Sequence, residues 1–233
     1  SLPGGINGTI IFTGPGQAYY DNVAHKIVLI STSLLSTLDV QASGTLTDFD
    51  IVTNDDASMG SINVGAALAG DSDIVVDAYC LSITVGNFSG TGSIKAGMNV
   101  RSITTGVFSG GSITAAFYAG GIFINGGFGT TATTGEARID ATAAGAIVIN
   151  GTFAGLVNIE RDLGAFTVNG AMSFAQFRAG SSVGSFLAGS INQSRVSVGD
   201  FLGPVSITGD ATESVIQAGG DLGSDAAPGG TGF

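Results

Sequence analysis

Residues 82–90, SITVGNFSG, return as SITTGVFSG at residues 102–110, and this repeated segment decides the fold. In both copies apolar residues alternate with small polar ones, which is the pattern of a short β-strand with one buried face. Gly, Ser and Asn surround each strand, and these residues favour turns. Because the same chemistry returns after about 20 residues, the segment indicates a repeat protein whose period should continue in the neighbouring sequence.

The same period extends on both sides of this segment. Aligned on a corner that often reads apolar–Gly, the repeats are anchored at Gly60, Leu81, Arg101, Gly120, Gly145, Gly164, Gly184, Gly203 and Gly223. Successive anchors are 21, 20, 19, 25, 19, 20, 19 and 20 residues apart. Apolar residues recur one position before, two after and four after most anchors, and no stretch keeps a helical period. Equivalent strands should therefore stack on themselves in parallel, because an antiparallel hairpin stack would reverse its register at every turn.

The sequence predicts an all-β fold: a parallel β-solenoid (β-helix) of roughly nine coils, with about 20 residues per coil. We expect a right-handed coil, although the residues themselves do not give the hand. The inside should hold columns of Ile, Val, Leu and Phe, in which Phe88, Phe108 and Phe128 form an aromatic ladder. Three asparagines at nearly equivalent turn positions can hydrogen-bond along the stack, namely Asn125, Asn150 and Asn169.

The repeat divides the chain into three parts. Residues 1–37 fit the period poorly and are expected to form an N-terminal cap or irregular first coils. Residues 38–223 form the solenoid, and residues 224–233 have the composition of a linker or tail. The 25-residue coil needs an insertion, for which Gly129–Glu136 is the expected place. No C-terminal cap is visible in the sequence, so we expect further coils or domains of the same longer chain to follow.

The composition excludes several classes of partner. Seven Lys and Arg stand against 18 Asp and Glu, for a net charge of −11. Nucleic acids and anionic membranes attract basic surfaces, so we expect neither as a partner. No apolar run approaches the roughly 20 residues of a membrane-spanning helix, so we expect no membrane insertion. The single cysteine, Cys80, cannot form an intrachain disulfide and lies in an apolar column, where we expect a buried, unreactive thiol.

Several coils close with related segments: AGGDLG at 218–223, VGDFLG at 198–203 and ERDLG at 160–164. These segments resemble repeats of large secreted bacterial proteins built as parallel β-helices, such as the passenger regions of filamentous adhesins and autotransporters. The resemblance covers roughly residues 60–223 and is specific for architecture rather than for activity. It implies a non-enzymatic structural or adhesive segment of a larger extracellular or cell-surface protein, with a polysaccharide or another cell-surface molecule as partner.

Acidic residues gather near the N-terminal end of the solenoid. Eight of the 18 lie within 39 positions: Asp39, Asp48, Asp50, Asp55, Asp56, Asp71, Asp73 and Asp77. Hard cations take several carboxylate oxygens, so the candidate ligands for a Ca²⁺ ion are Asp48, Asp50, Asp55 and Asp56. These acids lack the regular ligand spacing of known Ca²⁺ loops, so we expect solvated loop residues and no bound cofactor.

A carbohydrate-active β-helix enzyme, of the polysaccharide lyase or hydrolase type, is the alternative function. The stretch Asn54-Asp55-Asp56 faintly resembles the acidic segment of pectin-hydrolysing β-helix enzymes. Those families also carry Gly-His-Gly and Arg-x-Lys segments, which this chain lacks, and its one histidine, His25, lies far upstream. The five arginines fall at different phases of the coil, so we expect no basic column and assign no catalytic residue. A Ca²⁺-stabilised surface-layer module is a third interpretation.

Overall fold

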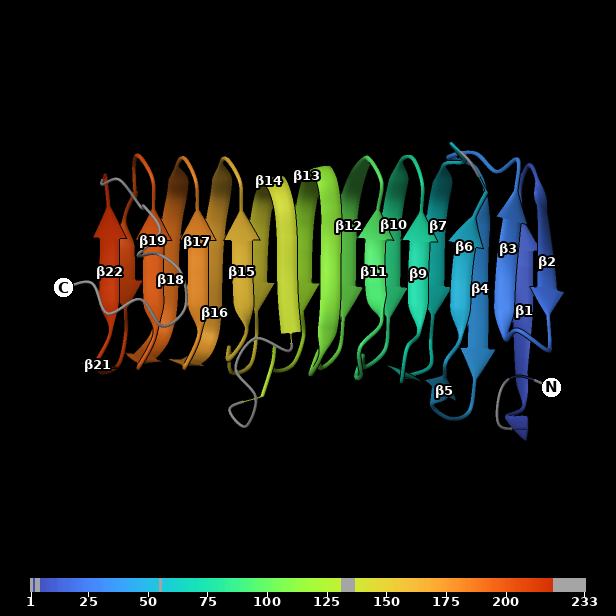
Figure 1. Cartoon of the computed structure of the whole chain (residues 1–233), viewed down its shortest axis with the longest axis horizontal. Helices are drawn as coiled ribbons and strands as arrows, with labels where there is room; N and C mark the ends of the chain where they lie inside the picture. Colours follow the sequence, from blue (N-terminus) through green and yellow to red (C-terminus); the bar gives the residue numbers. More distant parts are fainter. Residues whose placement is uncertain (1, 3–4, 55, 131–136, 220–233) are drawn as a thin grey trace.

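The chain winds into a rod in which two long sheets face each other across a core (Figure 1). The computed structural model describes residues 2, 5–54, 56–130 and 137–219. Each coil runs up through one sheet, down through the other, and returns over a short third side. We call the sheet nearest the viewer in Figure 1 the front sheet, the sheet behind it the back sheet, and the short return the narrow side.

The front sheet takes one short strand from each coil. Its members, in order along the rod, are β2 (Gln17–Asp21), β3 (Lys26–Ile30), β6 (Asp50–Thr53), β9 (Asp73–Val76), β11 (Ser93–Ala96), the first parts of β13 (Gly111–Ile124) and β14 (Ala137–Ile149), β15 (Leu156–Ile159), β17 (Gln176–Ala179), β19 (Arg195–Val198) and β22 (Val215–Ala218). From β3 onward every neighbouring pair is parallel.

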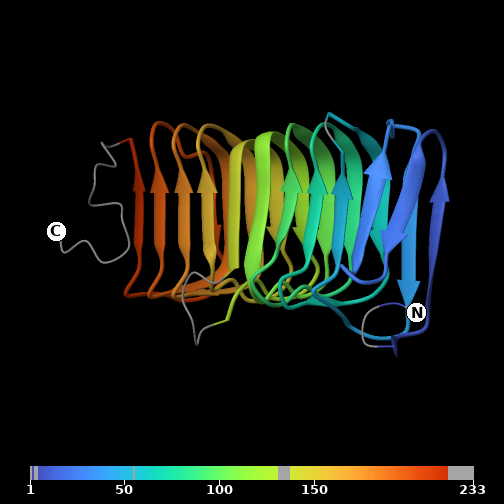
Figure 2. The same ribbon diagram turned by 45° about the vertical axis from the view of Figure 1, so that its right-hand side comes forward.

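The back sheet takes the next strand of each coil. Its members are β1 (Gly8–Thr13), β4 (Thr37–Ala42), β7 (Met59–Val64), β10 (Cys80–Val85), β12 (Asn99–Thr105), the second parts of β13 and β14, β16 (Leu163–Ser173), β18 (Val183–Asn192) and β20 (Val205–Ile207). The narrow side holds β5 (Leu46–Thr47), β8 (Leu68–Ala69), β21 (Ala211–Thr212) and single bridges such as Phe88 to Phe108. Figure 2 shows the coils following one another without a break along the rod.

The strand registers confirm the parallel β-solenoid of about nine turns with about 20 residues per coil. Ile83 pairs with Ile103, which pairs with Ile122, and the steps of 20 and 19 residues match the sequence period. The long coil is also where the sequence placed it, because Ile122 pairs with Ile147 across 25 residues. Of the expected insertion at residues 129–136, residues 131–136 lie outside the described part of the chain.

Antiparallel strands cover the N-terminal end of the rod. Strand β1 pairs antiparallel with β4, and β2 pairs antiparallel with β3. The parallel stack begins one layer later, with β3 on β6 and β4 on β7. The expected N-terminal region, residues 1–37, thus contains both this antiparallel end layer and the first strand of the parallel stack.

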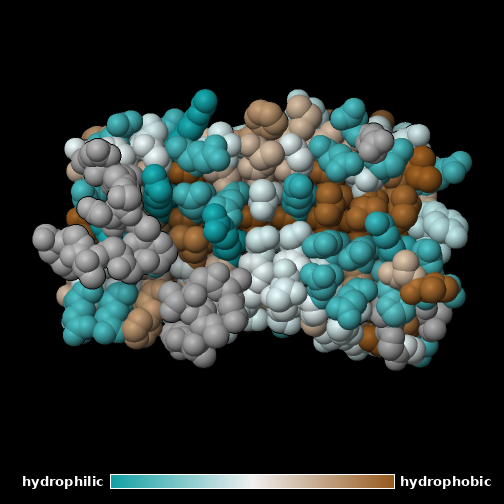
Figure 3. Space-filling model, in the orientation of Figure 1, coloured by the Kyte–Doolittle hydropathy of each residue, from teal (hydrophilic) through white to brown (hydrophobic). Residues whose placement is uncertain are grey.

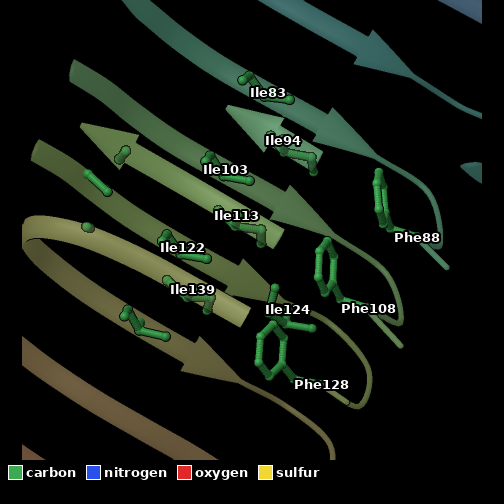
Figure 4. Packing of buried hydrophobic residues seen from close by; sticks show 14 of the residues in the cluster. Ile83, Phe88, Ile94, Ile103, Phe108, Ile113, Ile122, Ile124, Phe128 and Ile139 are labelled. Atoms are coloured by element: carbon green, nitrogen blue, oxygen red, sulfur yellow. The ribbon is translucent and has the colours of Figure 1, made fainter. Parts of the chain in front are cut away.

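Each inward column is filled by the apolar residues that the repeat predicted. On the narrow side the column runs from Leu68 through three phenylalanines to Phe153, one residue from each coil. The rings of Phe88 and Phe108 stack with centroids 4.9 Å apart, and those of Phe108 and Phe128 with centroids 5.4 Å apart. Figure 4 shows these rings beside the Ile columns of the two sheets. All of these side chains are fully buried, so the aromatic ladder is confirmed as part of the core.

Glycine occupies the corner position of the back sheet because the coils approach closely there. A Cβ atom on Gly145, Gly164 or Gly184 would lie far inside van der Waals contact of the carbonyl oxygen one coil below. A larger residue at any of these three glycines would push neighbouring coils apart. Because these glycines have no side chains, the outer surface of this part of the back sheet is formed by flat backbone.

The asparagine ladder is also present. The side-chain amide of Asn150 donates to Asn125 Oδ1 at 3.4 Å, and that of Asn169 donates to Asn150 Oδ1 at 2.7 Å. Equivalent side chains in stacked parallel coils satisfy one another in this way. We assign this ladder a stabilising role.

We expect the substitution Phe108→Ala to destabilise the protein by about 3–5 kcal/mol, because it removes a buried ring that has a stacked neighbour on each side. Thr104→Ala, on the outer surface of the back sheet, should change the free energy of unfolding by about 0.5 kcal/mol or less. Denaturant unfolding of the two variants measures both effects. Equal midpoints would contradict the inward placement of the ladder.

Candidate functional site

The front sheet carries most of the positive charge of the molecule. Five of the seven Lys and Arg residues lie on its strands, namely Lys26, Lys95, Arg138, Arg178 and Arg195. Three of the arginines thus lie on one face despite their different phases, but they form no continuous basic column, because Leu156 and Gln176 separate Arg138 from Arg195. Arg138 and Arg195 belong to one outward column, and Arg178 belongs to the adjacent column. Coil length varies, so equivalent positions lie at different numbers of residues from their repeat anchors. Counting along the sequence therefore assigned these arginines to different positions of the coil.

Acidic and polar groups are interleaved with these cations. Arg138 forms an ion pair with Asp140, and its Nη2 donates to Asp140 Oδ1 at 2.7 Å. This hydrogen bond raises the pKa of Arg138. Asn158 also donates to Asp140, at 3.3 Å. Figure 3 shows this charged surface and, over β3, β6 and β9, a hydrophobic band where Val28, Val52 and Val75 form an outward column.

A shallow polar groove of about 570 Å³ lies where the front sheet meets the narrow side. Hydroxyl groups of Thr91, Ser109 and Ser112 line it together with the guanidinium of Arg138. Since Arg138 is paired with Asp140, the groove has no unpaired acid or base among these residues. It can offer hydrogen bonds, but it lacks the pair of carboxyl groups that glycoside hydrolysis requires.

The acidic residues near the N-terminal end bind the backbone of the next coil. Asp48 Oδ1 accepts the N–H of Asp71 at 2.8 Å, and Asp50 Oδ1 accepts the N–H of Asp73 at 3.1 Å. Asp73 Oδ1 in turn accepts the N–H and the hydroxyl of Ser93, both at 2.7 Å. These carboxylates therefore connect successive coils, much as the asparagine ladder does. The 23-residue separation of Asp48 from Asp71 is a sequence signal for this role, because it is close to one coil length.

The candidate metal ligands are only partly placed. Asp48 and Asp50 lie at the bonding positions just described, and Asp56 has a left-handed backbone with φ 55°. Asp55 lies outside the described residues. Within residues 5–54, 56–130 and 137–219, no group of three or more His, Cys, Asp or Glu side chains is arranged to hold a metal ion. Binding of Ca²⁺ stays a prediction to be tested in solution.

Asp50 is the acid whose ionisation is most affected by this arrangement. Partial burial raises its pKa, and the nearby negative charges of Asp73 and Asp71 raise it further. The N–H of Asp73 and the charge of Lys26 act in the opposite direction but do not cancel the effect. The native protein therefore holds a proton at Asp50 more tightly than the unfolded chain does.

The back sheet presents a different surface. Within its described strands from β7 to β20, Arg101 is the only charged residue, and Gly, Ala, Ser and Thr dominate. Near its upper edge lies a cluster that we call the aromatic platform: Tyr79, Leu81, Arg101, Tyr118 and Phe123. Tyr79 and Tyr118 are 43% and 44% exposed, and they flank an apolar groove of about 240 Å³. Asn99 and Arg101, from the coil between the two tyrosines, also line it, together with Leu34, Cys80, Leu81, Val100 and Gly120.

The aromatic platform was not predicted from the sequence. The sequence indicates it only through Tyr118 and Phe123, which lie at outward positions on either side of Gly120-Gly121, where other coils have small residues. Tyr79 and Tyr118 are 39 residues apart in sequence, and only the stacking of coils brings them to one groove.

Cys80 lies beneath this groove and is confirmed as a buried residue, with 2% of its surface exposed. Burial raises the pKa of its thiol to about 12, although its contact with the Ser82 carbonyl oxygen opposes the shift. The thiolate is the reactive form of cysteine, so Cys80 is not a nucleophile at neutral pH.

Comparison with known proteins adds no identity: no family model matches the chain, and no curated protein or solved structure matches it. The described part of the structure contains no helix with the length and apolarity needed to cross a membrane.

We expect Asp50→Asn to raise the unfolding midpoint at pH 7. A raised native pKa means that ionising Asp50 costs stability, which is lost as pH rises from about 4 through the native pKa. The asparagine carbonyl can still accept the N–H of Asp73, so the variant keeps the bond and removes the charge. Thermal melts between pH 3 and pH 8 should show the advantage of the variant shrinking toward acid pH. Asp210→Asn, at an exposed position, is the control; a constant offset at every pH would contradict this account.

We expect Cys80 in the native protein to resist a thiol reagent at pH 8, because the thiol is both shielded and protonated. Labelling should become fast and stoichiometric once denaturant unfolds the chain. The time course of absorbance with a chromogenic disulfide measures both rates. Rapid labelling of the native protein would show that the β10 edge opens readily.

Proposed function

We propose that this chain is a non-enzymatic structural and adhesive segment of a larger extracellular protein on a bacterial surface. The supporting observation is the uninterrupted parallel stack from β3 to β22 over one continuous buried core. Such a stack transmits force along its axis through many backbone hydrogen bonds, and each coil contacts only its neighbours. A rod of this kind displays surface groups at a distance from its point of attachment.

The two ends of the described rod differ in how they are covered. The N-terminal end carries antiparallel strands, whereas the last described coil exposes residues of the inward columns. Ile216 is 38% exposed although its partner one coil below, Val196, is fully buried. Val205 is 44% exposed above the buried Phe186. Further coils or a domain of the same protein would remove this apolar surface from water.

The alternatives have weaker support. A carbohydrate-active enzyme needs paired catalytic groups, and the polar groove around Arg138 has none among its described lining residues. A Ca²⁺-stabilised surface-layer module would use the acids near β6 and β9, whose oxygens accept backbone hydrogen bonds. Millimolar Ca²⁺ should therefore leave the melting temperature nearly unchanged, and a rise of many degrees that a chelator reverses would favour this module instead.

Two measurements test the proposed function. An antibody raised against the purified chain should label intact cells of the organism that encodes it, and labelling only after lysis would overturn the surface location. The purified chain, incubated with neutral and acidic polysaccharides, should release neither reducing ends nor unsaturated uronates. Product that accumulates in proportion to enzyme concentration would replace the structural role with the enzymatic one.

A further inference from the structure

We propose that the aromatic platform binds a neutral glycan chain. Sugar rings stack on Tyr79 and Tyr118, and Asn99 and Arg101 bond to sugar hydroxyls between them. This proposal deepens the adhesive part of the proposed function and rests on it, while the structural role of the rod does not depend on it.

Two rings of the platform, those of Tyr118 and Phe123, lie over glycines of the back sheet. The Tyr118 hydroxyl is 2.8 Å from where a Cβ atom of Gly145 would stand, one coil further along the rod. The Phe123 ring covers Gly121 in the same way, with its edge 2.5 Å from the equivalent Cβ position, and Gly121 is buried beneath it. Rings held flat on a rigid sheet present an apolar face to solvent at little entropic cost. The C–H face of a pyranose ring is the complementary surface.

The spacing of the tyrosines suits an extended chain of sugars. Tyr118 pairs with Asn99, and Tyr79 precedes the strand one coil below, so the backbones of the two tyrosines are about two coils, or roughly 9.6 Å, apart along the rod. The Tyr118 side chain reaches toward the following coil. That separation is comparable to a disaccharide unit of an extended glycan. The chain would run parallel to the rod axis and pass over β10, β12 and β13.

The surface of the groove is almost wholly apolar, so the polar ends of Asn99 and Arg101 would meet sugar hydroxyls at its rim. Asn99 and Arg101 line the groove from the middle coil. Within the described residues, Arg101 forms no ion pair, and its guanidinium projects from an exposed position. A guanidinium fork can donate to two adjacent oxygens at once, which matches a vicinal pair of sugar hydroxyls.

The net charge of the chain and the charge of Arg101 favour a neutral glycan over charged partners. The chain carries a net charge of −11, which repels polyuronates and nucleic acids, and Arg101 is the single cation of this surface. A second copy docking by two-fold symmetry through this patch would bring the two Arg101 side chains toward each other, which is unfavourable. An uncharged polymer meets neither penalty.

Native-gel affinity electrophoresis with soluble hydroxyethylcellulose and galactomannan tests the proposal, with polygalacturonate as the charged comparison. We expect the neutral polymers to retard the chain and to quench its tyrosine fluorescence, which is free of tryptophan emission because the chain has no Trp. The double variant Tyr79→Ala/Tyr118→Ala should bind about tenfold or more weakly. Tyr19→Ala, which removes a more exposed ring from the front sheet, is the control and should bind as the parent does.

Each outcome decides the proposal. Circular dichroism and thermal melts first establish that the variants are folded, which is expected because the substituted rings lie on the outer surface and outside the buried core. The glycan site is overturned if neither neutral polymer retards the chain, or if the double variant is retarded as strongly as the parent. Neither result would affect the structural role of the rod. A concentration-dependent mass in sedimentation that the double variant abolishes would instead make the platform an interface between copies.

Discussion

Backbone hydrogen bonding between equivalent strands of successive coils is the interaction on which the rest of this structure depends. It fixes each residue directly above its equivalent one coil earlier, at the strand spacing of about 4.8 Å. Ile62, Ile83, Ile103 and Ile122 therefore form one column, and every member must be apolar because the column is buried along its whole length. A polar residue in the column would lose its water without gaining a partner.

The same constraint organises the polar side chains. Because equivalent positions repeat at a hydrogen-bonding distance, an acceptor in one coil lies next to a donor in the next. Asn150 bridges Asn125 and Asn169 in this way, and Asp50 and Asp73 accept from the coil above. The acidic cluster that looked like a metal-binding segment in sequence is thus largely a set of connections between coils. Placing these carboxylates close together disfavours the ionised form of Asp50, whose pKa is raised by burial and by the neighbouring carboxylates.

The outer surfaces of the two sheets differ in charge. The front sheet carries five cations and several acids, and Arg138 forms an ion pair with Asp140. The back sheet is nearly uncharged, and close packing of its glycine corners leaves room for Tyr118 and Phe123 to lie flat. A rod that keeps one face hydrated and charged, and the other flat and apolar, is suited to display a binding surface without loss of solubility.

The sequence by itself determined the fold class, the coil length, the inward columns, the place of the long coil, and the burial of Cys80 and the phenylalanine ladder. These features follow from the two-residue period of strands and from a repeat that is strong enough to align by eye. Only the tertiary structure decided which outward residues are neighbours. Coils vary from 19 to 25 residues, so a phase counted along the chain drifts, and Arg138 and Arg195 reach one column despite different counts. Tyr79 and Tyr118 line one groove only because their coils stack. A buried column must repeat in every coil, so it leaves a periodic signal in the sequence. A surface cluster needs only one residue from each of a few coils, so it leaves no such signal.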